Sequence, residues 1–330
     1  MKPVGIVGIG SYVPETVLTN HELEQMVDTS DEWIRTRTGI VERRLAVDGE
    51  TTSDLALEAS LRALKDANIR KEDIDLIIVA TASPDMIFPS TACFLQQKLG
   101  LKNIPAFDVA AACSGFVFGL SVAWQYVATG TYKTVLFVGA DTLTHFVNWQ
   151  DRSTCVLFGD GAGAVILRET EPGYGILSCS LSSDGSGANL LKIPAGGANL
   201  PGTAESVNEG LHFIQMNGNE VFKFAVRAIP EVSERALKEA GLTVDDVDFF
   251  IPHQANSRII NTAAARLRIG ADKVVTNIEK YGNTSTASIP LALDEIWQQG
   301  KLEKGSLLLL VGFGAGLTWG ANIVRWSRRA

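Results

Sequence analysis

The sequence predicts an α/β protein whose two halves are copies of one unit. The segment ALKDANIRKEDIDLIIVA (63–80) aligns with ALKEAGLTVDDVDFFIPH (236–253) at a sequence offset of 173, since 236 − 63 = 173. Both copies have the pattern of an amphipathic helix, an acidic turn and a buried strand. The same offset carries LFVGAD (136–141) onto LLVGFG (309–314). A period this long indicates a repeated half-domain rather than a solenoid.

From the repeat we expect an N-terminal half over residues 1–172 and a C-terminal half over residues 173–330, related by a pseudo-twofold axis. The 330 residues, of which 46% are hydrophobic, can bury the core of one large domain or of two fused ones. The stretches 109–132 and 306–324 carry no charged residue and are long enough to span a bilayer. Because both contain glycine and polar residues, we assign them to buried helices and central strands instead.

Two glycine-rich motifs and one capping pattern allow further predictions of local structure. GIVGIGSYVP (5–14) contains G-x-G, but Pro14 follows and no helix opens there, so the pattern predicts a tight turn after the first strand and no dinucleotide site. FGDGAGAVIL (158–167) lacks the Gly-Lys-Ser/Thr of a phosphate-binding loop and predicts a turn that enters a packed strand. Thr19 and Glu22 have the spacing of a capping box, which predicts a helix start.

The net charge, the N-terminal sequence and the cysteine spacing narrow the range of functions that we expect. The net charge of −8 argues against non-specific nucleic-acid binding. The N-terminus MKPVGIVGIGSYVPE has neither the apolar core nor the cleavage site of a signal peptide, so we expect a cytoplasmic protein with reduced thiols. No CxxC or zinc-ligand spacing occurs among Cys93, Cys113, Cys155 and Cys179, and we expect neither a metal site nor a disulfide framework.

Cys113 is the candidate nucleophile. It lies in DVAAACSGFVFGL (108–120), after a strand-like lead from Ile104 to Val109 and before a helix-like segment from Phe116 to about Ala128. A thiol at the first turn of a helix faces unpaired N–H groups and the positive end of the helix dipole, which lower its pKa, whereas burial among alanines raises it. The alternative interpretation is a small buried hydrophobe.

His253 and Asn283 are candidate partners for this cysteine. His253 ends the strand that corresponds to Asp75–Ala80, and Asn283 falls close to the position that corresponds to Cys113. It lies in a small-residue loop before the predicted helix Ile289–Gln298. Ligands of open α/β sheets bind beyond the carboxyl ends of strands, so the repeat brings all three residues together. An asparagine amide can donate to a developing oxyanion. The alternatives are a core histidine and a turn or cap asparagine.

The segment DTSDEWIRTRTGIVERR (28–44) places Trp33 among four arginines in an otherwise acidic chain. One interpretation is a solvated helix with surface ion pairs. The other is the mouth of a site that stacks a nucleotide base and pairs with phosphates, for which tryptophan and arginine are suited.

Together these motifs resemble the β-ketoacyl-acyl carrier protein synthase III family, a branch of the thiolase-fold condensing enzymes. The resemblance covers essentially the whole chain, up to GFGAGLTWGANIVRW (312–326), and rests on DTSDEWIRTRTGI, FPSTAC (88–93), the Cys113 run, FGDGAGA, PHQAN and YGNTSTAS. It implies a layered α-β-α-β-α core with mixed sheets and a catalytic triad of Cys113, His253 and Asn283. A thiolase would have a second catalytic cysteine late in the chain, and none follows Cys179. The DEW motif and the chain length favour synthase III over the related hydroxymethylglutaryl-CoA synthases and plant-type polyketide synthases.

The resemblance also implies the remaining site residues. The oxyanion hole would combine the backbone N–H groups of Cys113 and Ala315, where a family member often has glycine. The CoA-binding residues would be Thr29, Trp33, Arg37, Arg152, Gly218, Phe222 and Asn256. The acyl pocket would be lined by Phe88, Leu143, Phe158 and Leu191, with Phe88 reaching across a dimer interface into the pocket of the partner. Acyl carrier protein would dock on Gln254, Ala255, Asn256, Ser257, Arg258 and Arg266, with Arg268 as a further candidate. The alternative for the arginines is an ordinary solvated surface.

The activity that the resemblance implies is the initiation of type II fatty acid synthesis. A short acyl-CoA, with an acetyl or branched acyl group, acylates Cys113, and malonyl-acyl carrier protein then condenses with loss of CO2 to give a 3-oxoacyl-acyl carrier protein. The implied partners are acyl-CoA, malonyl-acyl carrier protein and a second copy of the chain, with no cofactor, metal ion, nucleic acid or membrane. Two alternatives stay open. One is a relative that makes a specialised metabolite or acylates an alcohol or amine, and the other is a non-enzymatic acyl-CoA-binding protein.

Overall fold

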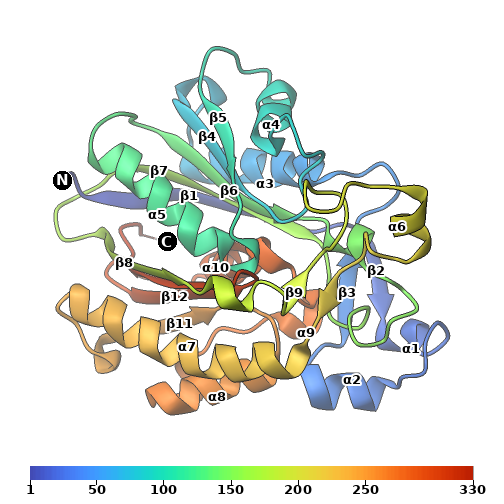
Figure 1. Cartoon of the computed structure of the whole chain (residues 1–330). Coiled ribbons are helices and arrows are strands. Elements are labelled where there is room, and N and C mark those ends of the chain that lie inside the picture. Colours follow the sequence, from blue (N-terminus) through green and yellow to red (C-terminus); the bar gives the residue numbers. More distant parts are fainter. Residues whose placement is uncertain (330) are drawn as a thin grey trace.

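The computed structural model describes residues 1–329, and its main features are two β-sheets separated by buried helices (Figure 1). The first sheet has the strand order β1-β7-β6-β4-β5. Its strands are β1 (Val4–Tyr12), β4 (Leu76–Ala80), β5 (Ala106–Val109), β6 (Val135–Asp141) and β7 (Gly161–Glu169). β4 is parallel to β5 and β6, whereas β7 is antiparallel to both β1 and β6, so the sheet is mixed.

The second sheet repeats this arrangement with the order β11-β12-β13-β8. Its strands are β8 (Gly175–Ser183), β11 (Phe249–Pro252), β12 (Leu307–Gly314) and β13 (Thr318–Arg325). β11 is parallel to β12, and the other pairs are antiparallel. The first residues of β4 and β11, and the last residues of β6 and β12, are separated by the offset found in the sequence, so the repeat recurs in the structure.

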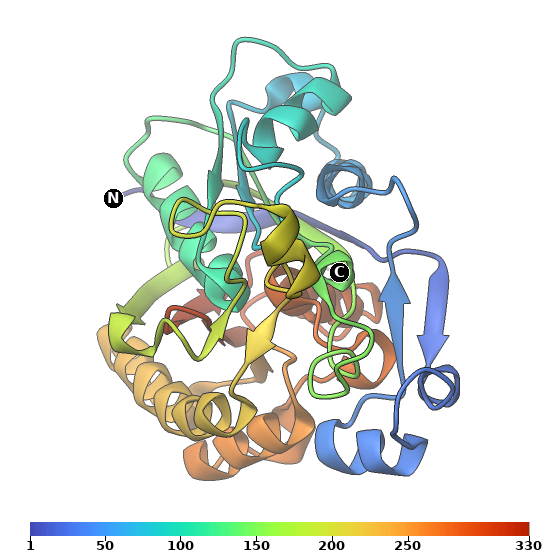
Figure 2. The same cartoon turned by 45° about the vertical axis from the view of Figure 1, so that its right-hand side comes forward.

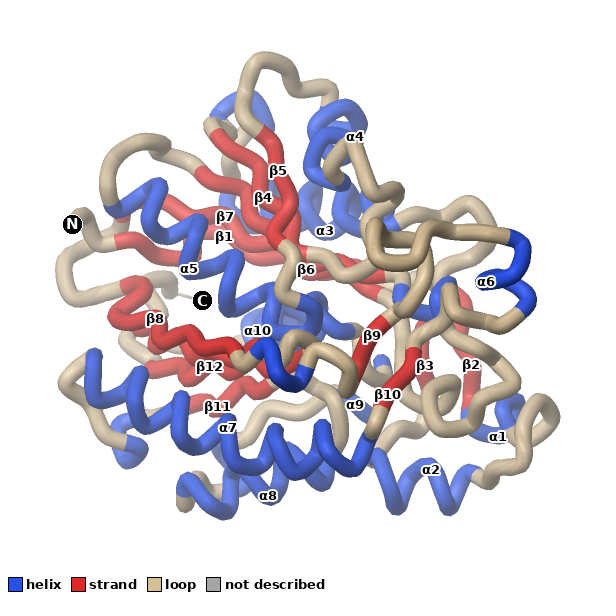
Figure 3. The backbone as a smooth tube through the Cα atoms, in the orientation of Figure 1, coloured by secondary structure: helices blue, strands red, loops and turns tan. Residues whose placement is uncertain are grey.

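Helices fill the space between the sheets and cover both outer faces (Figure 3). α5 (Gly115–Ala128) and α10 (Ser288–Gln298) share one apolar core with the inner faces of both sheets. α3 (Thr52–Ala67) and α4 (Thr91–Leu99) pack on the outer face of the first sheet, and α7 (Gly218–Glu239) and α8 (Ser257–Leu267) on that of the second. The result is the predicted α-β-α-β-α layering.

The prediction of a tight turn in GIVGIGSYVP is wrong, because β1 continues through these glycines to Tyr12. The strand has a register shift between Ile6 and Gly8. A Cβ atom at Gly8 or Gly10 would lie 2.5 Å or 2.4 Å from atoms of α3. The two glycines therefore allow the helix to approach the strand closely.

The remaining elements form a lobe beside the sheets, which Figure 2 brings forward. They are the antiparallel pair β2 (Thr16–Thr19) and β3 (Glu42–Leu45), the antiparallel pair β9 (Leu191–Lys192) and β10 (Gln215–Met216), and the helices α1 (Asn20–Leu23), α2 (Asp31–Thr38), α6 (Ala204–Asn208) and α9 (Ile278–Tyr281). The capping box of Thr19 and Glu22 starts α1 as predicted. Between residues 1 and 329, none of the helices combines the length and the apolar character needed to cross a membrane.

Candidate active site

Cys113 lies in a strained turn between β5 and α5. The 3₁₀ turn η2 (Ala112–Ser114) leads into α5, and Ala112 has a left-handed φ of 44°. The turn η7 (Ser285–Ala287) leads into α10 in the same way, with Ser285 at a φ of 50°. The hydroxyl of Ser285 donates a hydrogen bond of 3.3 Å to the Cys113 Sγ. Such conformations persist only where the surrounding structure enforces them, and they concentrate at functional sites.

Of the opposing effects on the pKa of the Cys113 thiol, burial is the largest. Cys113 is only 6% exposed, and its burial raises the pKa of the thiol to about 12. The hydrogen bond from Ser285 lowers the pKa and the charge of Asp141 raises it, both by less than burial does. The unliganded protein therefore holds a neutral thiol at pH 7, and the helix start alone does not produce a thiolate.

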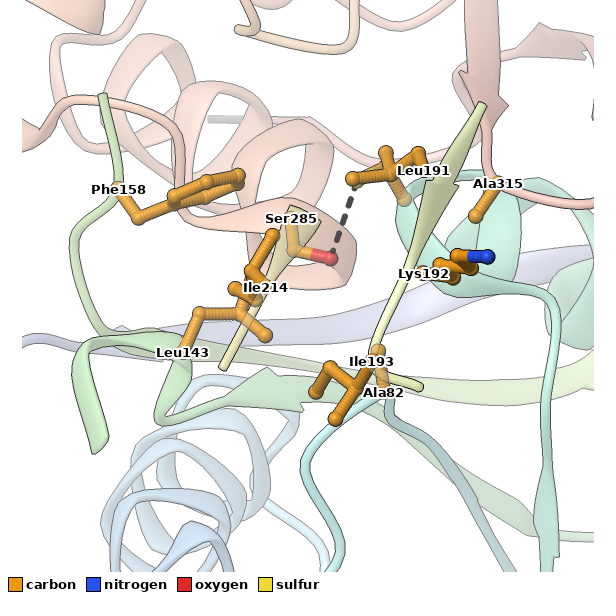
Figure 4. A pocket seen from close by; sticks show the side chains of 11 residues that line it. Ala82, Leu143, Phe158, Leu191, Lys192, Ile193, Ile214, Ser285 and Ala315 are labelled. Atoms are coloured by element: carbon orange, nitrogen blue, oxygen red, sulfur yellow. Dashed lines mark hydrogen bonds between the residues drawn. The ribbon is translucent and has the colours of Figure 1, made fainter. Parts of the chain in front are cut away.

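Two cavities meet at Cys113. The first, of about 220 Å³, is mostly apolar (Figure 4) and its lining includes Ala82, Leu143, Phe158, Leu191 and Ala315. Ser285 also projects into it, and the dashed line in Figure 4 marks its hydrogen bond to Cys113. The second cavity, of about 120 Å³, is a passage that shares Cys113, Phe158 and Leu191 with the first. An acyl group bound to Cys113 can occupy the first cavity while a thioester chain enters through the second.

His253 lines the passage directly after β11. Its side chain is 1% exposed, its Nδ1 lies 2.6 Å from the Ser288 Oγ, and its ring meets the edge of Phe313 with centroids 5.1 Å apart. Burial lowers the pKa of His253 to about 3, so the imidazole is neutral at pH 7. With Nδ1 at Ser288, only Nε2 is left to interact with a bound molecule.

Asn283 lines the same passage, and hydrogen bonds of both its backbone and its side chain fix its position. Its N–H donates to the Leu157 carbonyl at 2.8 Å, and its carbonyl accepts from the Gly159 N–H at 3.1 Å. The Oδ1 atom accepts a hydrogen bond of 2.9 Å from the Ser285 N–H. This bond leaves the amide Nδ2 as the donor group available to the passage.

Of the residues in the predicted mouth segment, Arg43 is fully buried and donates to the Asn20 side chain and the Val156 carbonyl, whereas Trp33 and Arg37 lie near the surface. Two guanidinium groups lie near the Trp33 ring, with Arg152 at 5.3 Å and Arg37 at 5.8 Å from its centroid. Arg152 also donates to the Asp28 carbonyl at 2.6 Å. The Thr29 hydroxyl is buried in this segment without a hydrogen-bond partner among residues 1–329. Both interpretations therefore apply to part of this segment: Arg35 pairs with Asp31 and Arg44 with Glu42, while the exposed Arg37 and Arg152 lie close to the Trp33 ring.

The mouth connects to the passage through α8. Gly218, Phe222 and Asn256 line the passage. The Asn256 amide donates to the Arg37 carbonyl at 3.0 Å, which joins the start of α8 to α2, where the ends of the two helices lie near each other in Figures 1 and 2. The Arg258 guanidinium lies 5.6 Å from the centroid of the Phe222 ring.

Two of the predicted surface residues need separate comment. Gln254 cannot belong to a docking surface, because it is 1% exposed and bonds inward to the Pro252 and Val275 carbonyls and the Asn277 N–H. It positions the PHQAN loop instead. Phe88 is 82% exposed and is not among the residues that line the acyl cavity of its own chain. Ala255 and Ser257 are half-buried, and Arg258, Arg266 and Arg268 are exposed, although Arg266 also donates to the Val226 carbonyl.

Sequence analysis missed Ser285 and Ser288. Both belong to the YGNTSTAS motif, but hydroxyl residues beside glycine and asparagine are typical of turns and caps. Only the fold shows that one hydroxyl meets the thiol of Cys113 and the other the ring of His253. The left-handed φ of Ser285 is also invisible in the sequence, since serine is not a residue that favours this conformation.

The duplicated halves, the layered core and a buried cysteine that faces a histidine and an asparagine from the other half define a thiolase-fold condensing enzyme. Two family models match the chain: "3-Oxoacyl-[acyl-carrier-protein (ACP)] synthase III" over residues 107–185 and the C-terminal domain of the same enzyme over residues 237–326. The chain belongs to the β-ketoacyl-[acyl-carrier-protein] synthase III family.

Individual relatives agree with this assignment over their full length. The β-ketoacyl-[acyl-carrier-protein] synthase III of Caldanaerobacter subterraneus is 56% identical over 98% of both chains. That of Desulfitobacterium hafniense is 54% identical over 100% of this chain and 99% of the relative. The crystal structure of 3-oxoacyl-[acyl-carrier-protein] synthase III from Aquifex aeolicus has a TM-score of 0.91 at 48% identity and covers 98% of this chain and 100% of that one. The corresponding enzyme from Pseudomonas aeruginosa has a TM-score of 0.92 at 39% identity over all of both chains.

Proposed function

We propose that this chain starts fatty acid chains by condensing a short acyl-CoA with malonyl-acyl carrier protein, through an acyl-enzyme at Cys113. The observation that carries the proposal is the position of Cys113 between an apolar cavity and a passage lined by His253 and Asn283. One cavity suits an acyl group, and the other suits a thioester chain that reaches in from the surface.

In the first half-reaction the Cys113 Sγ bonds to the carbonyl carbon of acyl-CoA, and the bond from that carbon to the CoA sulfur breaks. The developing oxyanion is stabilised by the N–H groups of Cys113 and Ala315. A Cβ atom at Gly314 would lie 2.8 Å from the Cys113 nitrogen, so glycine keeps this space open. Because burial raises the pKa of the Cys113 thiol, the sulfur attacks as its proton leaves, and the proton ends on the departing CoA thiol.

In the second half-reaction the bond between the malonyl carbon and its carboxylate breaks, and CO2 leaves. The electron pair forms an enolate at the thioester, whose oxygen accepts hydrogen bonds from the His253 Nε2–H and the Asn283 Nδ2–H. The enolate carbon attacks the acyl carbon on Cys113, the Cys113 sulfur leaves as a thiolate, and a solvent proton restores the thiol. No electrons enter or leave, so the step needs no redox cofactor.

The neutrality of both donors favours the enolate over the substrate. A cationic histidine would hold the malonyl carboxylate as strongly as the enolate and would stabilise the ground state too. Since burial keeps His253 uncharged, its hydrogen bond strengthens mainly when charge moves onto the thioester oxygen. Ser288, as the donor to His253 Nδ1, would fix the tautomer that carries the proton on Nε2.

The other partners belong to the same proposal. Trp33 and Arg152 would sandwich the adenine of CoA, with Arg37 and Thr29 near its phosphates and Gly218, Phe222 and Asn256 along the pantetheine. Malonyl-acyl carrier protein is acidic and would dock beside the exposed Arg258 and Arg266. The exposed Phe88 supports a dimer in which it covers the acyl cavity of the partner. The two halves would divide near residue 172, and the enzyme would act in the cytoplasm.

The test is intact-protein mass spectrometry after mixing the protein separately with acetyl-CoA and isobutyryl-CoA. We expect a mass gain of one acyl group on the wild type and none on Cys113→Ala, which should still bind CoA. Added malonyl-acyl carrier protein should discharge the adduct and yield a 3-oxoacyl-acyl carrier protein. Discharge only by an alcohol or amine would show simple acyl transfer, and binding without any adduct would show an acyl-CoA-binding protein.

A further inference from the structure

Asp141 is a fully buried carboxylate that the reaction steps above do not use. It is the last residue of β6 and is 0% exposed. Its Oδ1 accepts hydrogen bonds from four groups of the segment after β4: the Thr81 hydroxyl at 2.9 Å, the Ala82 N–H at 2.7 Å, and the Ser83 hydroxyl and N–H at 2.9 Å and 3.1 Å. Its Oδ2 accepts from the Thr286 hydroxyl at 2.6 Å and from the Thr286 N–H at 3.0 Å. All six partners are donors, as an ionised carboxylate requires.

The internal repeat shows which position of the other half corresponds to Asp141. At the offset of the repeat, Thr286 is the counterpart of Cys113 and Gly314 is the counterpart of Asp141, so each pair occupies equivalent positions of the two halves. Gly314 leaves room beside the Cys113 N–H, where the oxyanion of the acylation step would sit. In the other half, the equivalent N–H of Thr286 is occupied by Asp141. The side chain of Asp141 therefore fills the counterpart of the oxyanion pocket.

Each carboxylate oxygen of Asp141 contacts a segment that also lines the site around Cys113. On the Oδ1 side, Ala82 lines the acyl cavity beside Cys113. On the Oδ2 side, Thr286 follows Ser285, whose hydroxyl meets the Cys113 sulfur and whose N–H holds the amide of Asn283. Asp141 thus joins the wall of the cavity to the turn that carries two groups facing the reacting atoms.

We propose that Asp141 is a positioning residue that locks η7 through Thr286, so that the Ser285 hydroxyl meets the thiol and the Asn283 amide faces the thioester oxygen. Without this anchor, η7 loses its hydrogen bonds to the Asp141 side chain on β6, although the Thr286 backbone still packs against Gly139, so the left-handed conformation of Ser285 is held less firmly. The inference rests on the proposed condensation, because the groups it positions are those that the two half-reactions use.

The experiment compares variants that each change one threonine contact with the same carboxylate. Thr286→Val removes the hydroxyl donor and keeps the methyl group that packs near Gly115. Thr286→Ser keeps the hydroxyl. Thr81→Val is the matched control, because it removes one hydroxyl donor from the Oδ1 side, away from η7. The readouts are kcat for condensation, KM for acyl-CoA and the rate of iodoacetamide alkylation of Cys113 as a function of pH.

We expect Thr286→Val to lower kcat about tenfold or more, the scale of one lost hydrogen bond to a charged group, with KM for acyl-CoA within about twofold. Its alkylation profile should move to higher pH, because the Ser285 hydrogen bond lowers the pKa of the Cys113 thiol. Thr286→Ser should restore both readouts, and Thr81→Val should change kcat less than about twofold.

Equal losses in Thr286→Val and Thr81→Val, or an unchanged alkylation profile in Thr286→Val, would overturn the inference and leave Asp141 a purely structural group. If the valine variant does not fold, Thr286→Ala against Thr286→Ser repeats the comparison with less bulk. A wild type that forms no acyl adduct would instead contradict the proposed function, so the two failures are distinguishable.

Discussion

The centre of the site (Cys113, His253 and Asn283) and its mouth (Trp33 and the arginines beside it) are built in different ways. The centre is buried, and each of its groups stands at the end of a strand or in a turn enforced by both halves of the fold. The mouth is exposed, and it rests on the short helix α2, a loop and stacked cations. A hydrogen bond in a dry, preorganised centre is worth far more than a contact between solvated charges. We therefore expect large effects of substitution at the centre and small, salt-dependent effects at the mouth.

Asn283→Ala should have the largest effect of the variants considered, because it removes one of two donors to the enolate. Decarboxylation of malonyl-acyl carrier protein should fall about 10²–10³-fold, the usual consequence of deleting an oxyanion donor. Acylation of Cys113 should fall no more than about tenfold, since it loses only the acceptor that holds the Ser285 N–H. Separate assays of adduct formation and CO2 release measure the two steps. Equal losses in both would show that Asn283 acts on the whole turn and not on the enolate.

The charge state of His253 gives a second test of the centre. Burial lowers its pKa from an ordinary value of 6.5 to about 3, so decarboxylation by the acylated enzyme should show no inflection near pH 6.5. The folded state binds this proton less readily than the unfolded state does. The stability that depends on neutral His253 is therefore complete above pH 6.5 and is lost as the pH falls from 6.5 towards 3. Urea titrations of the wild type and His253→Gln between pH 7 and 4 should show the steeper loss in the wild type.

The same comparison explains which parts could be predicted from the sequence. The duplication correctly predicts the two similar sheets, because helix, turn and strand patterns are local. Cys113 and His253 follow strands, as the repeat predicts, whereas Asn283 follows the helix α9 and not a strand. Asp141 and Ser285 could not be predicted, because their partners lie 145 and 172 residues away and contacts at that range depend on the fold. Gln254 was misplaced for the same reason, since a polar side chain in a loop looks exposed until its buried partners are known.

Trp33→Ala tests the mouth, with an intermediate effect expected. The substitution removes the aromatic ring that the Arg37 and Arg152 guanidinium groups both approach, so KM for acyl-CoA should rise about tenfold, the scale of a stacked base together with cation–π contacts. The kcat for condensation should stay within about twofold, because no group of the centre moves. Initial rates with acetyl-CoA at saturating malonyl-acyl carrier protein measure both constants. A fall in kcat without a rise in KM would mean that α2 positions the centre, and the distinction between centre and mouth would fail.

Arg258→Glu should have the smallest effect and tests docking of the acyl carrier protein. Arg258 is exposed beside the passage, with its guanidinium over Phe222, so reversing its charge should raise KM for malonyl-acyl carrier protein about fivefold at low salt. The effect should shrink as ionic strength rises, because solvent-exposed charges are screened over about 8 Å at 0.15 M salt. Lys301→Glu is the matched control, because this exposed lysine precedes β12, whose other end carries Gly314 at the site. If both reversals raise KM equally, the carrier protein senses the net charge of −8 rather than a local patch, and Arg258 belongs to neither the mouth nor a docking surface.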